Sequence, residues 1–209
     1  MKKGICIIGT GGFAREVLCL IDDLGRFDEV SCFMEPDDLW GSTWKDKILM
    51  EKPVWPQSQF NPGIHTAIIG IGAPRIREKV VQQLPQDTAY ETLVHPSAVI
   101  SRWVDIGEGS VICAGCILTC NIKLGKQTQL NIHTTIGHDC ELADYFTSAP
   151  SVNISGNCHF GKYVYFGTAA AVRQGITICD DVVIGMGGVV VKNIEDSGVY
   201  VGNPVGKLR

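Results

Sequence analysis

Residues 100–194 repeat every six residues without a break, from ISRWVDIGEGSVICAGCILT at 100–119 to GITICDDVVIGMGGVVVKNI at 175–194. Steps of six from the first residue reach Val, Ile, Leu or Phe at fifteen of sixteen positions. These positions are Ile100, Ile106, Ile112, Leu118, Leu124, Leu130, Ile136, Leu142, Ser148, Ile154, Phe160, Phe166, Val172, Ile178, Ile184 and Val190. A second column, four residues further along each unit, is mostly small or β-branched and carries no charge.

A period of six fits neither an α-helix nor an alternating strand. It predicts a coil of short strands, one per hexapeptide, with the large aliphatic residue inside. Glycine follows that residue at 107, 125, 137, 161, 167 and 185, where we expect a turn to need its backbone freedom. Units of the form aliphatic-Gly-x-x-small-x resemble the left-handed parallel β-helix, in which three repeats make one triangular coil. The resemblance implies that residues eighteen apart stack in neighbouring coils, about 4.8 Å apart.

The 209 residues allow one or two domains and a sizeable core. The net charge is −4 and the basic residues are scattered, which favours neither a nucleic acid nor an anionic membrane as partner. We find no long apolar run and no secretory leader, so we expect no membrane insertion and a cytoplasmic location.

Nine cysteines are a raised count, and in the cytoplasm we expect them to be reduced. Cys113, Cys116 and Cys120 have a spacing that could indicate a metal site. The repeat places only the middle one in the inward column, together with Cys140 and Cys158. We therefore favour small core residues over ligands and expect no metal.

The chain begins with a predicted strand at 4–8, a glycine-rich turn GTGGFA at 9–14 and a helix that Gly25 ends. In this context the backbone N–H groups at a helix N-terminus can hold a phosphate. The alternative is a turn that only lets the helix and the strand pack closely.

A second strand is predicted at 29–34, and Glu35 after it could hold a ribose hydroxyl. Further expectations are a strand at 64–69, a helix from Pro74 to about 84 and a last strand at 90–94, whereas 39–62 give no clear pattern. We therefore expect an α/β Rossmann-like nucleotide-binding domain at 1–92, a left-handed β-helix at 93–194 and a tail at 195–209. A mononucleotide or nucleotide sugar fits this short first domain better than a dinucleotide.

Several segments together resemble the NeuD/PglD-type nucleotide-sugar acetyltransferases of the left-handed β-helix superfamily. They are 9–17, the turn 70–72 with Arg77, the junction 95–100, the hexapeptides and the ending 201–204. Such enzymes move an acetyl group from acetyl-CoA to an amine on a nucleotide-linked sugar, and they work as trimers. The resemblance implies acetyl-CoA as co-substrate, a nucleotide-linked amino sugar as substrate and a homotrimer.

The segment IGHDC at 136–140 resembles the catalytic segment of this family, with His138 as general base. An imidazole suits that role near neutral pH, and its repeat position faces away from the interior. Asp139 matches the acidic neighbour that orients the ring. Gly156, eighteen residues after the base, matches the residue whose backbone N–H holds the thioester oxygen. The alternative is an exposed histidine in a turn.

The same resemblance implies binding roles for other positions. Asn131 matches a contact to the sugar near the accepting amine, and Thr168 and Met186 line the CoA groove with Gly156. Thr147 stands where many relatives carry a second histidine.

In the first domain, Gly12, Phe13 and Ala14 match the turn that binds the phosphates of the sugar nucleotide. Glu35 matches an acidic residue near the nucleotide, and Gly72 matches a turn beside the base. Pro36 and the pair Ala73-Pro74 depart from the family pattern next to these positions.

Three other functions stay open. His133, five residues before His138, has the spacing of paired ligands in γ-class carbonic anhydrases, although Ser97 stands near the expected third histidine and His95 lies two residues off. A non-catalytic nucleotide-sugar-binding scaffold would keep the glycine turn without needing His138. A sugar O-acetyltransferase of the sialic-acid type would differ only in the acceptor atom.

Overall fold

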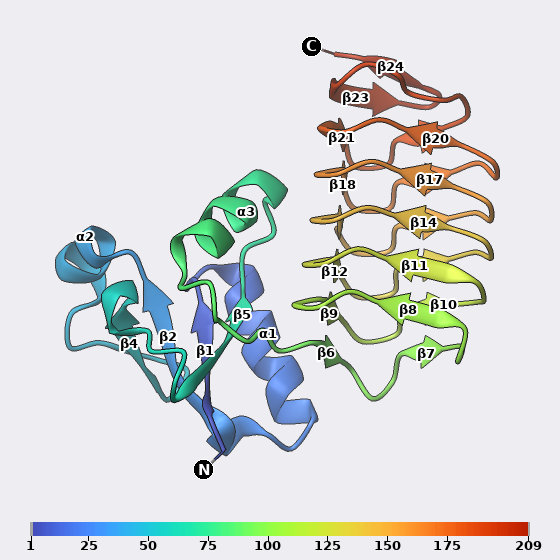
Figure 1. Cartoon of the computed structure of the whole chain (residues 1–209). Coiled ribbons are helices and arrows are strands. Elements are labelled where there is room, and N and C mark those ends of the chain that lie inside the picture. Colours follow the sequence, from blue (N-terminus) through green and yellow to red (C-terminus); the bar gives the residue numbers. More distant parts are fainter. Residues whose placement is uncertain (1, 209) are drawn as a thin grey trace. The chain divides into compact units, whose positions relative to one another are not determined.

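A computed structural model describes residues 2–208 as two compact units. The first holds the residues up to Gly72 together with Ile76–Leu93, and the second holds Ala73–Arg75 together with the residues from Val94 on (Figure 1). Each unit has a hydrophobic core of its own.

The first unit is built around a five-stranded sheet in the order β3-β4-β2-β1-β5. These strands are β1 (Gly4–Ile8), β2 (Val30–Glu35), β3 (Ile48–Leu49), β4 (Lys52–Pro56) and β5 (His65–Ile69). All neighbours are parallel except β3 and β4. The helices are α1 (Gly12–Asp23), η1 (Phe27–Glu29), α2 (Asp37–Leu39), η2 (Trp40–Trp44), η3 (Gln57–Gln59) and α3 (Pro74–Gln83). The strands predicted at 4–8, 29–34 and 64–69, the two predicted helices and the stop at Gly25, with φ of 68°, are confirmed within one or two residues.

Residues 39–62, which had no predicted structure, form η2, the β3–β4 hairpin and η3. The indole N–H of Trp40 donates to the Val54 carbonyl oxygen at 2.7 Å, so a long-range contact orders this segment rather than a local pattern. The strand expected at 90–94 is wrong as one element. Tyr90 makes a single bridge to Ala67, and β6 (Leu93–Val94) pairs instead with β9 of the second unit, because the chain leaves one sheet for the other between them.

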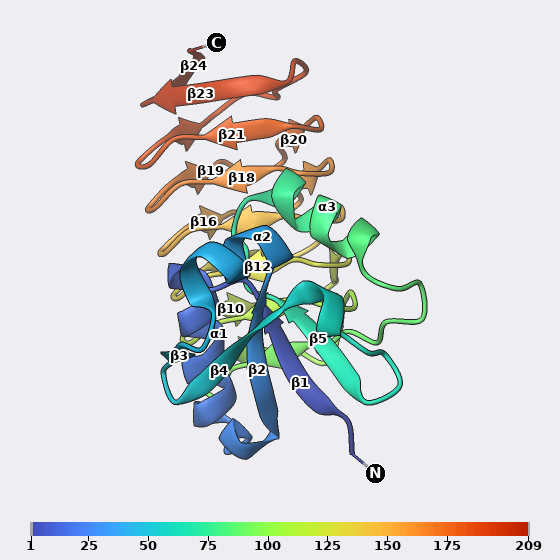
Figure 2. The ribbon, with the colours of Figure 1, turned by 90° about the vertical axis from the view of Figure 1, so that its left-hand side faces the viewer.

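The second unit is a left-handed β-helix with three faces (Figures 1 and 2). The first face contains β7 (Val99–Ile100), β10 (Ile117–Leu118), β13 (Thr135–Ile136), β16 (Asn153–Ile154), β19 (Ala171–Val172) and β22 (Val189–Val190). The second contains β8 (Val104–Ile106), β11 (Ile122–Leu124), β14 (Glu141–Leu142), β17 (His159–Phe160) and β20 (Thr177–Ile178). The third contains β6, β9 (Val111–Ile112), β12 (Gln129–Leu130), β15 (Thr147–Ser148), β18 (Tyr165–Phe166), β21 (Val182–Ile184), β23 (Gly198–Gly202) and β24 (Val205–Lys207).

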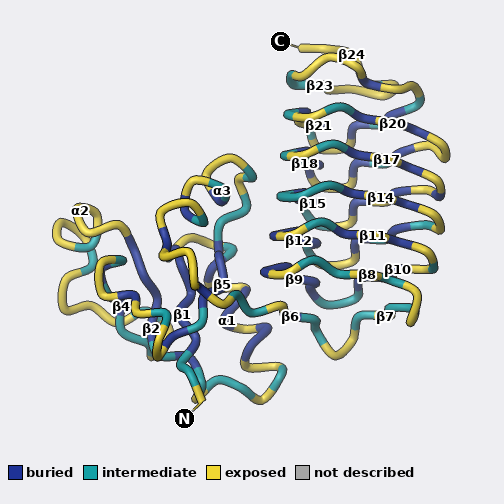
Figure 3. The backbone as a smooth tube through the Cα atoms, in the orientation of Figure 1, coloured by how far each residue is buried: buried dark blue, intermediate teal, exposed yellow. Residues whose placement is uncertain are grey.

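Residues eighteen apart pair in register, as Leu130 does with Ser148, so the predicted stacking is confirmed. The two predicted inward columns are buried along most of the β-helix, visible as dark segments of the tube in Figure 3. The one polar residue of the aliphatic column, Ser148, forms a hydrogen bond of 2.8 Å with the Thr134 hydroxyl. This bond removes most of the cost of burying both hydroxyl groups.

From the unit that begins at Ile106 to the one that begins at Ile184, the corner turns use a left-handed residue three positions after the inward residue. Positive φ recurs at Gly109, Gly115, Asn121, Gln127, His133, Asp139, Tyr145, Ser151, Asn157, Tyr163, Ala169, Gly175, Asp181 and Gly187. The glycines directly after the aliphatic residue do not have positive φ, so the expected reason for them is wrong. A Cβ on Gly137 would lie 2.6 Å from the Gly156 nitrogen, and glycine is therefore needed for the close approach of neighbouring coils.

The residues after 194 close the C-terminal end of the β-helix. β23 adds to β21 in parallel, and β24 folds back on β23 in antiparallel, as Figure 2 shows at the end of the stack. The hairpin covers the last open coil of the hydrophobic core. Across residues 2–208, no helix is long and apolar enough to cross a membrane.

Candidate active site

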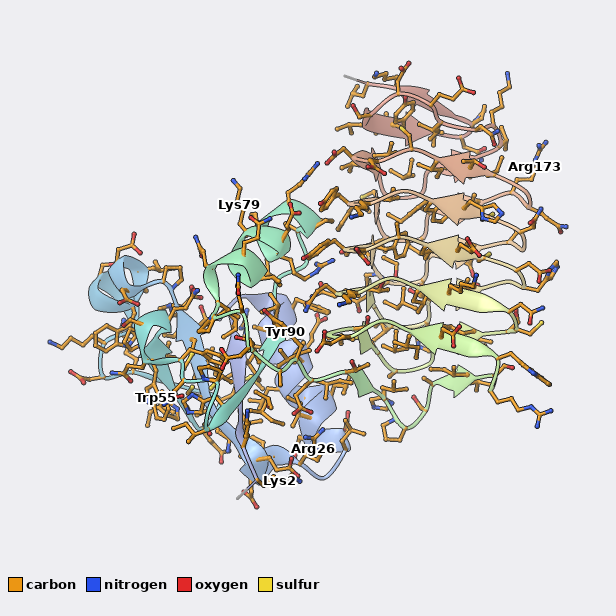
Figure 4. The ribbon with its side chains drawn as sticks, viewed as in Figure 1. Lys2, Arg26, Trp55, Lys79, Tyr90 and Arg173 are labelled. Atoms are coloured by element: carbon orange, nitrogen blue, oxygen red, sulfur yellow. The ribbon has the colours of Figure 1, made fainter. Side chains whose placement is uncertain are left out.

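His138 lies in the turn that joins β13 on the first face to β14 on the second. The inward side chains of Ile136 and Cys140 anchor the two ends of this turn, while the residues between them are exposed or half-buried. We call the stack of turns that join first-face strands to second-face strands the His138 corner. Arg173 projects from the same corner two coils further along, at the edge of the β-helix (Figure 4).

The imidazole of His138 is held by its neighbour. Its Nδ1 lies 2.7 Å from Asp139 Oδ2, and the other oxygen, Oδ1, accepts a hydrogen bond of 3.1 Å from the Asn121 side-chain amide. The hydrogen bonds from His138 and then Asn121 lower the pKa of Asp139 below its ordinary value, so this carboxylate is ionised at neutral pH. An ionised carboxylate only accepts, so Nδ1 carries the proton and Nε2 of the neutral ring is free to take one.

Gly156 occupies the equivalent turn position one coil later. A Cβ there would lie 2.6 Å from His138 Nε2 and 2.7 Å from Cε1, so only glycine leaves room for the ring as it stands. The structure therefore brings the two predicted residues together at one corner.

The backbone N–H of Gly156 has no acceptor within residues 2–208. Equivalent N–H groups at another corner are capped by carboxylates eighteen residues on, Lys126 by Asp144 at 2.9 Å and Lys162 by Asp180 at 2.8 Å. Gln174 stands eighteen residues after Gly156, and its side chain forms no hydrogen bond with the described residues. An N–H group left open beside an imidazole can bind a developing oxyanion.

The first unit supplies a turn suited to a phosphate. Gly12, Phe13 and Ala14 begin α1, and the first helical bond runs from Arg15 N–H to Gly11 O at 3.2 Å, so the preceding N–H groups are open to a ligand. A Cβ on Gly70 would lie 2.6 Å from Ala14, so the same turn also packs closely against the end of β5. Both interpretations of the glycine turn are compatible with this geometry.

Glu35 and Gly72 lie at the same edge of the sheet as this turn. Glu35 ends β2, is buried and accepts a hydrogen bond from the Thr10 hydroxyl. Gly72 follows β5, and its carbonyl accepts from the buried guanidinium of Arg77 at 3.1 Å. Strand order reverses between β1 and β5, and ligands of open parallel sheets bind at the carboxyl ends beside such a switch point.

Comparisons with known proteins show which family and which folds this chain is similar to. Residues 4–84 match the family described as the PglD N-terminal domain. A GDP-perosamine N-acetyltransferase of Escherichia coli O157:H7 is 29% identical over 109 residues, 52% of this chain and 49% of that protein. The chain thus spans about half the length of this curated relative.

Two solved structures superpose over nearly the whole chain. WeeI from Acinetobacter baumannii AYE is 31% identical with a TM-score of 0.88, and the match covers 99% of this chain and 100% of that one. A histidine-to-asparagine variant of perosamine N-acetyltransferase from Caulobacter crescentus, in complex with CoA and GDP-perosamine, is 27% identical with a TM-score of 0.89, over 99% and 97%. The chain belongs to the NeuD/PglD-type sugar acetyltransferases.

In this NeuD/PglD-type chain the remaining predicted site residues of the β-helix lie on a different corner from His138. Asn131, Thr168 and Met186 all lie in turns that join third-face strands to first-face strands, which we call the Asn131 corner. Met186 is 78% exposed there, and the Asn131 side-chain oxygen accepts from Ile132 N–H at 2.7 Å. One copy of the chain does not bring these residues to His138.

Within one copy of the chain, the two histidines of the zinc interpretation do not meet. His133 lies on the Asn131 corner, where its ring packs over Gly115, whereas His138 lies on the other corner. No three His, Cys, Asp or Glu side chains in residues 2–208 are grouped to hold a metal ion. Thr147, at the position of the family's second histidine, is a buried residue of β15.

Thr10 and Asn121 are two polar residues of these sites that were not predicted from the sequence. Thr10 sits inside the quoted glycine turn but forms its hydrogen bond to a residue 25 positions away. Asn121 could have been found, because it precedes Asp139 by eighteen residues and therefore occupies the same turn position one coil earlier.

Proposed function

We propose that the protein is an acetyl-CoA-dependent N-acetyltransferase that acts on the amino group of a nucleotide-linked amino sugar. One observation supports this most strongly: an imidazole whose Nδ1 is held by Asp139 presents Nε2 beside Gly156, whose N–H is open. Transfer from a thioester to an amine needs a base and an oxyanion donor at one place.

The sugar amine attacks the thioester carbonyl carbon while His138 Nε2 accepts the proton that the nitrogen loses. Gly156 N–H donates to the oxyanion of the tetrahedral intermediate, and Asp139 stabilises the imidazolium. The intermediate then expels the CoA thiolate, which takes the proton back from His138. The products are the amide and free CoA, and the base is restored.

The nucleotide is held by the first unit. The N–H groups of Gly12, Phe13 and Ala14 bind its phosphates, Glu35 accepts a hydrogen bond from a ribose hydroxyl, and Gly72 lies beside the base. Relatives named for GDP-perosamine make a GDP-linked amino sugar the first acceptor to test.

The active form is a homotrimer in which the His138 corner of one copy meets the Asn131 corner of the next. The first face, which lies between these corners, presents no charge: its outward residues are Val99, Ile117, Thr135, Asn153, Ala171 and Val189. The second face carries Asp105, Lys123, Glu141 and His159 and suits solvent. Thr168 and Met186 of the neighbouring copy then line the groove for CoA. Light scattering should give three times the chain mass of 22.7 kDa, and a stable monomer would reject this assembly.

We place the enzyme in the cytoplasm, in the synthesis of surface glycans or glycoprotein sugars. All nine cysteines are free, six of them buried, which suits a reducing compartment.

The experiment mixes the protein with acetyl-CoA and GDP-, UDP-, dTDP- or CMP-linked amino sugars and follows thiol release together with the mass of the product. The matching hydroxy sugars distinguish nitrogen from oxygen as acceptor. Thiol release that requires an amino sugar supports the proposal, and none with any amino sugar rejects it.

A further inference from the structure

Asn121 and Asp139 occupy the same turn position in neighbouring coils. Both have left-handed backbone conformations, with φ of 55° and 59°. The Asn121 Nδ2 lies 3.1 Å from Asp139 Oδ1, while Asp139 Oδ2 holds His138 Nδ1 at 2.7 Å. Each oxygen of the carboxylate therefore has one partner, and rotation of the carboxylate breaks both bonds.

Asparagine tolerates the left-handed conformation better than most residues, so the turn alone could explain its presence. Asn157, one coil after Asp139, shows what the turn alone requires. Its φ is also 55°, and its backbone N–H donates to the His138 carbonyl oxygen, but its side chain forms no hydrogen bond within residues 2–208. The amide contact of Asn121 is thus an additional property of that residue.

The pair formed by His138 and Asp139, which we call the dyad, needs the hydrogen bond from Asn121 because the pair is half exposed. The exposed fraction is 51% for the His138 side chain and 52% for that of Asp139. Exposed contacts to a charged group hold their geometry weakly, since water competes for both partners. Asn121 and Asp139 line an open groove with a volume of about 570 Å³. The other titratable or charged side chains that line it are Arg102, Asp105, Lys123, Glu141 and His159. Lys123 pairs with Glu141 at 2.9 Å, and within residues 2–208 the Asp139 carboxylate forms hydrogen bonds with His138 and Asn121.

We propose that Asn121 is a positioning residue that locks the Asp139 carboxylate, and thereby keeps the His138 proton on Nδ1 and Nε2 free to accept. The inference rests on the proposed acetyl transfer, in which His138 is the base. In this role Asn121 acts through Asp139 and not on a reacting atom.

Two substitutions separate this role from the turn conformation. Asn121→Gly keeps the left-handed backbone and removes the amide, and Asn121→Asp keeps the shape but replaces the donor by a second carboxylate. Asn157→Gly is the matched control, with the same residue type and φ at the same corner. Each protein is measured for kcat, for the KM of both substrates, and by ¹⁵N NMR for the tautomer of the His138 ring without substrate.

For Asn121→Gly we expect kcat to fall about tenfold with KM values unchanged, and the ring to become a mixture of Nδ1–H and Nε2–H tautomers. For Asn121→Asp the added negative charge stabilises the imidazolium, so the acidic limb of the kcat profile moves to higher pH. The control should keep the wild-type tautomer.

Wild-type kcat and a pure Nδ1–H tautomer in Asn121→Gly would overturn the inference. The same tautomer change in Asn157→Gly would also overturn it. The tautomer is measured without substrate, so the NMR result does not depend on activity. If the wild-type protein transfers no acetyl group, the proposed function is rejected, and the NMR comparison still tests the role of Asn121.

Discussion

Nε2 of His138 lies 2.6 Å from the point that a Cβ on Gly156 would occupy, although the two residues are eighteen apart in the chain. This contact exists because each coil of the β-helix repeats the turn geometry of the one before it. A general base and an open N–H group are thereby placed at one corner by backbone geometry alone.

Gly156→Ala should abolish most activity while leaving the fold intact. The new methyl group would displace the imidazole, and a misplaced base costs about 100-fold in kcat. The stability cost should be small because the methyl group meets the end of an exposed side chain. Steady-state kinetics and thermal unfolding check both parts, with Gly206→Ala, whose Cβ meets nothing within 4 Å, as control. Full activity in Gly156→Ala would show that catalysis does not depend on this position of the His138 imidazole.

Asp139→Asn should lower kcat ten- to a hundredfold without changing KM. The amide can donate to Nδ1 and so favour the tautomer with the proton on Nε2, which is the wrong one for a base. The effect should be smaller than at a buried triad because this dyad is half exposed. Since the pKa of Asp139 is held below its ordinary value of 3.8, loss of wild-type activity near pH 6 cannot come from its protonation. Steady-state kinetics recorded as a function of pH for both proteins check these two expectations. An unchanged kcat in Asp139→Asn would contradict the role of the carboxylate.

Glu35→Gln should weaken binding of the nucleotide sugar about tenfold and leave the affinity for CoA unchanged. The carboxylate lies beside the glycine turn through its hydrogen bond with Thr10, where it can accept from a ribose hydroxyl. Isothermal titration with each ligand measures the two affinities. Asp38→Asn, an exposed acidic residue three positions later, is the control. Equal nucleotide affinity in wild type and Glu35→Gln would remove this residue from the site.

His65→Asn should flatten the pH dependence of stability below neutrality. Burial lowers the pKa of His65, so the unfolded chain binds a proton first as the pH falls below 6.5, and stability is lost from there down through the folded-state pKa. The asparagine oxygen can still accept from Asn61 N–H, as Nδ1 does at 3.2 Å, but it does not titrate. Urea unfolding at pH 7.5 and 5.5 should show a smaller difference for the variant. An equal difference would contradict the prediction.

The β-helix was predictable because its inward aliphatic residues recur every six positions in the sequence. Ser148 interrupts this pattern, and it is tolerated because the Thr134 hydroxyl forms a hydrogen bond with it. The turn glycines were explained wrongly because the sequence shows their place in the repeat but not the distance to the next coil, as at Gly137. The order of residues 39–62 depends on contacts such as Trp40 with Val54, which no local pattern contains.

Part of the candidate site was predictable because residues eighteen apart occupy the same position in neighbouring coils. His138 and Gly156 share a phase of eighteen, and the structure joins them. Asn131 differs from His138 by seven residues and so lies on another corner, which the spacing alone would have shown. Roles that depend on how copies of the chain assemble, such as those of Thr168 and Met186, stay predictions.

The most direct test of the account compares kcat of wild type and His138→Ala with acetyl-CoA and the nucleotide-linked amino sugar that the acceptor screen identifies, with GDP-linked sugars tried first. His159→Ala, an exposed histidine of the second face, is the control. If His138 is the base, its replacement lowers kcat roughly 100-fold or more with little change in KM, and the control turns over normally. Near-normal turnover in His138→Ala would contradict the central claim.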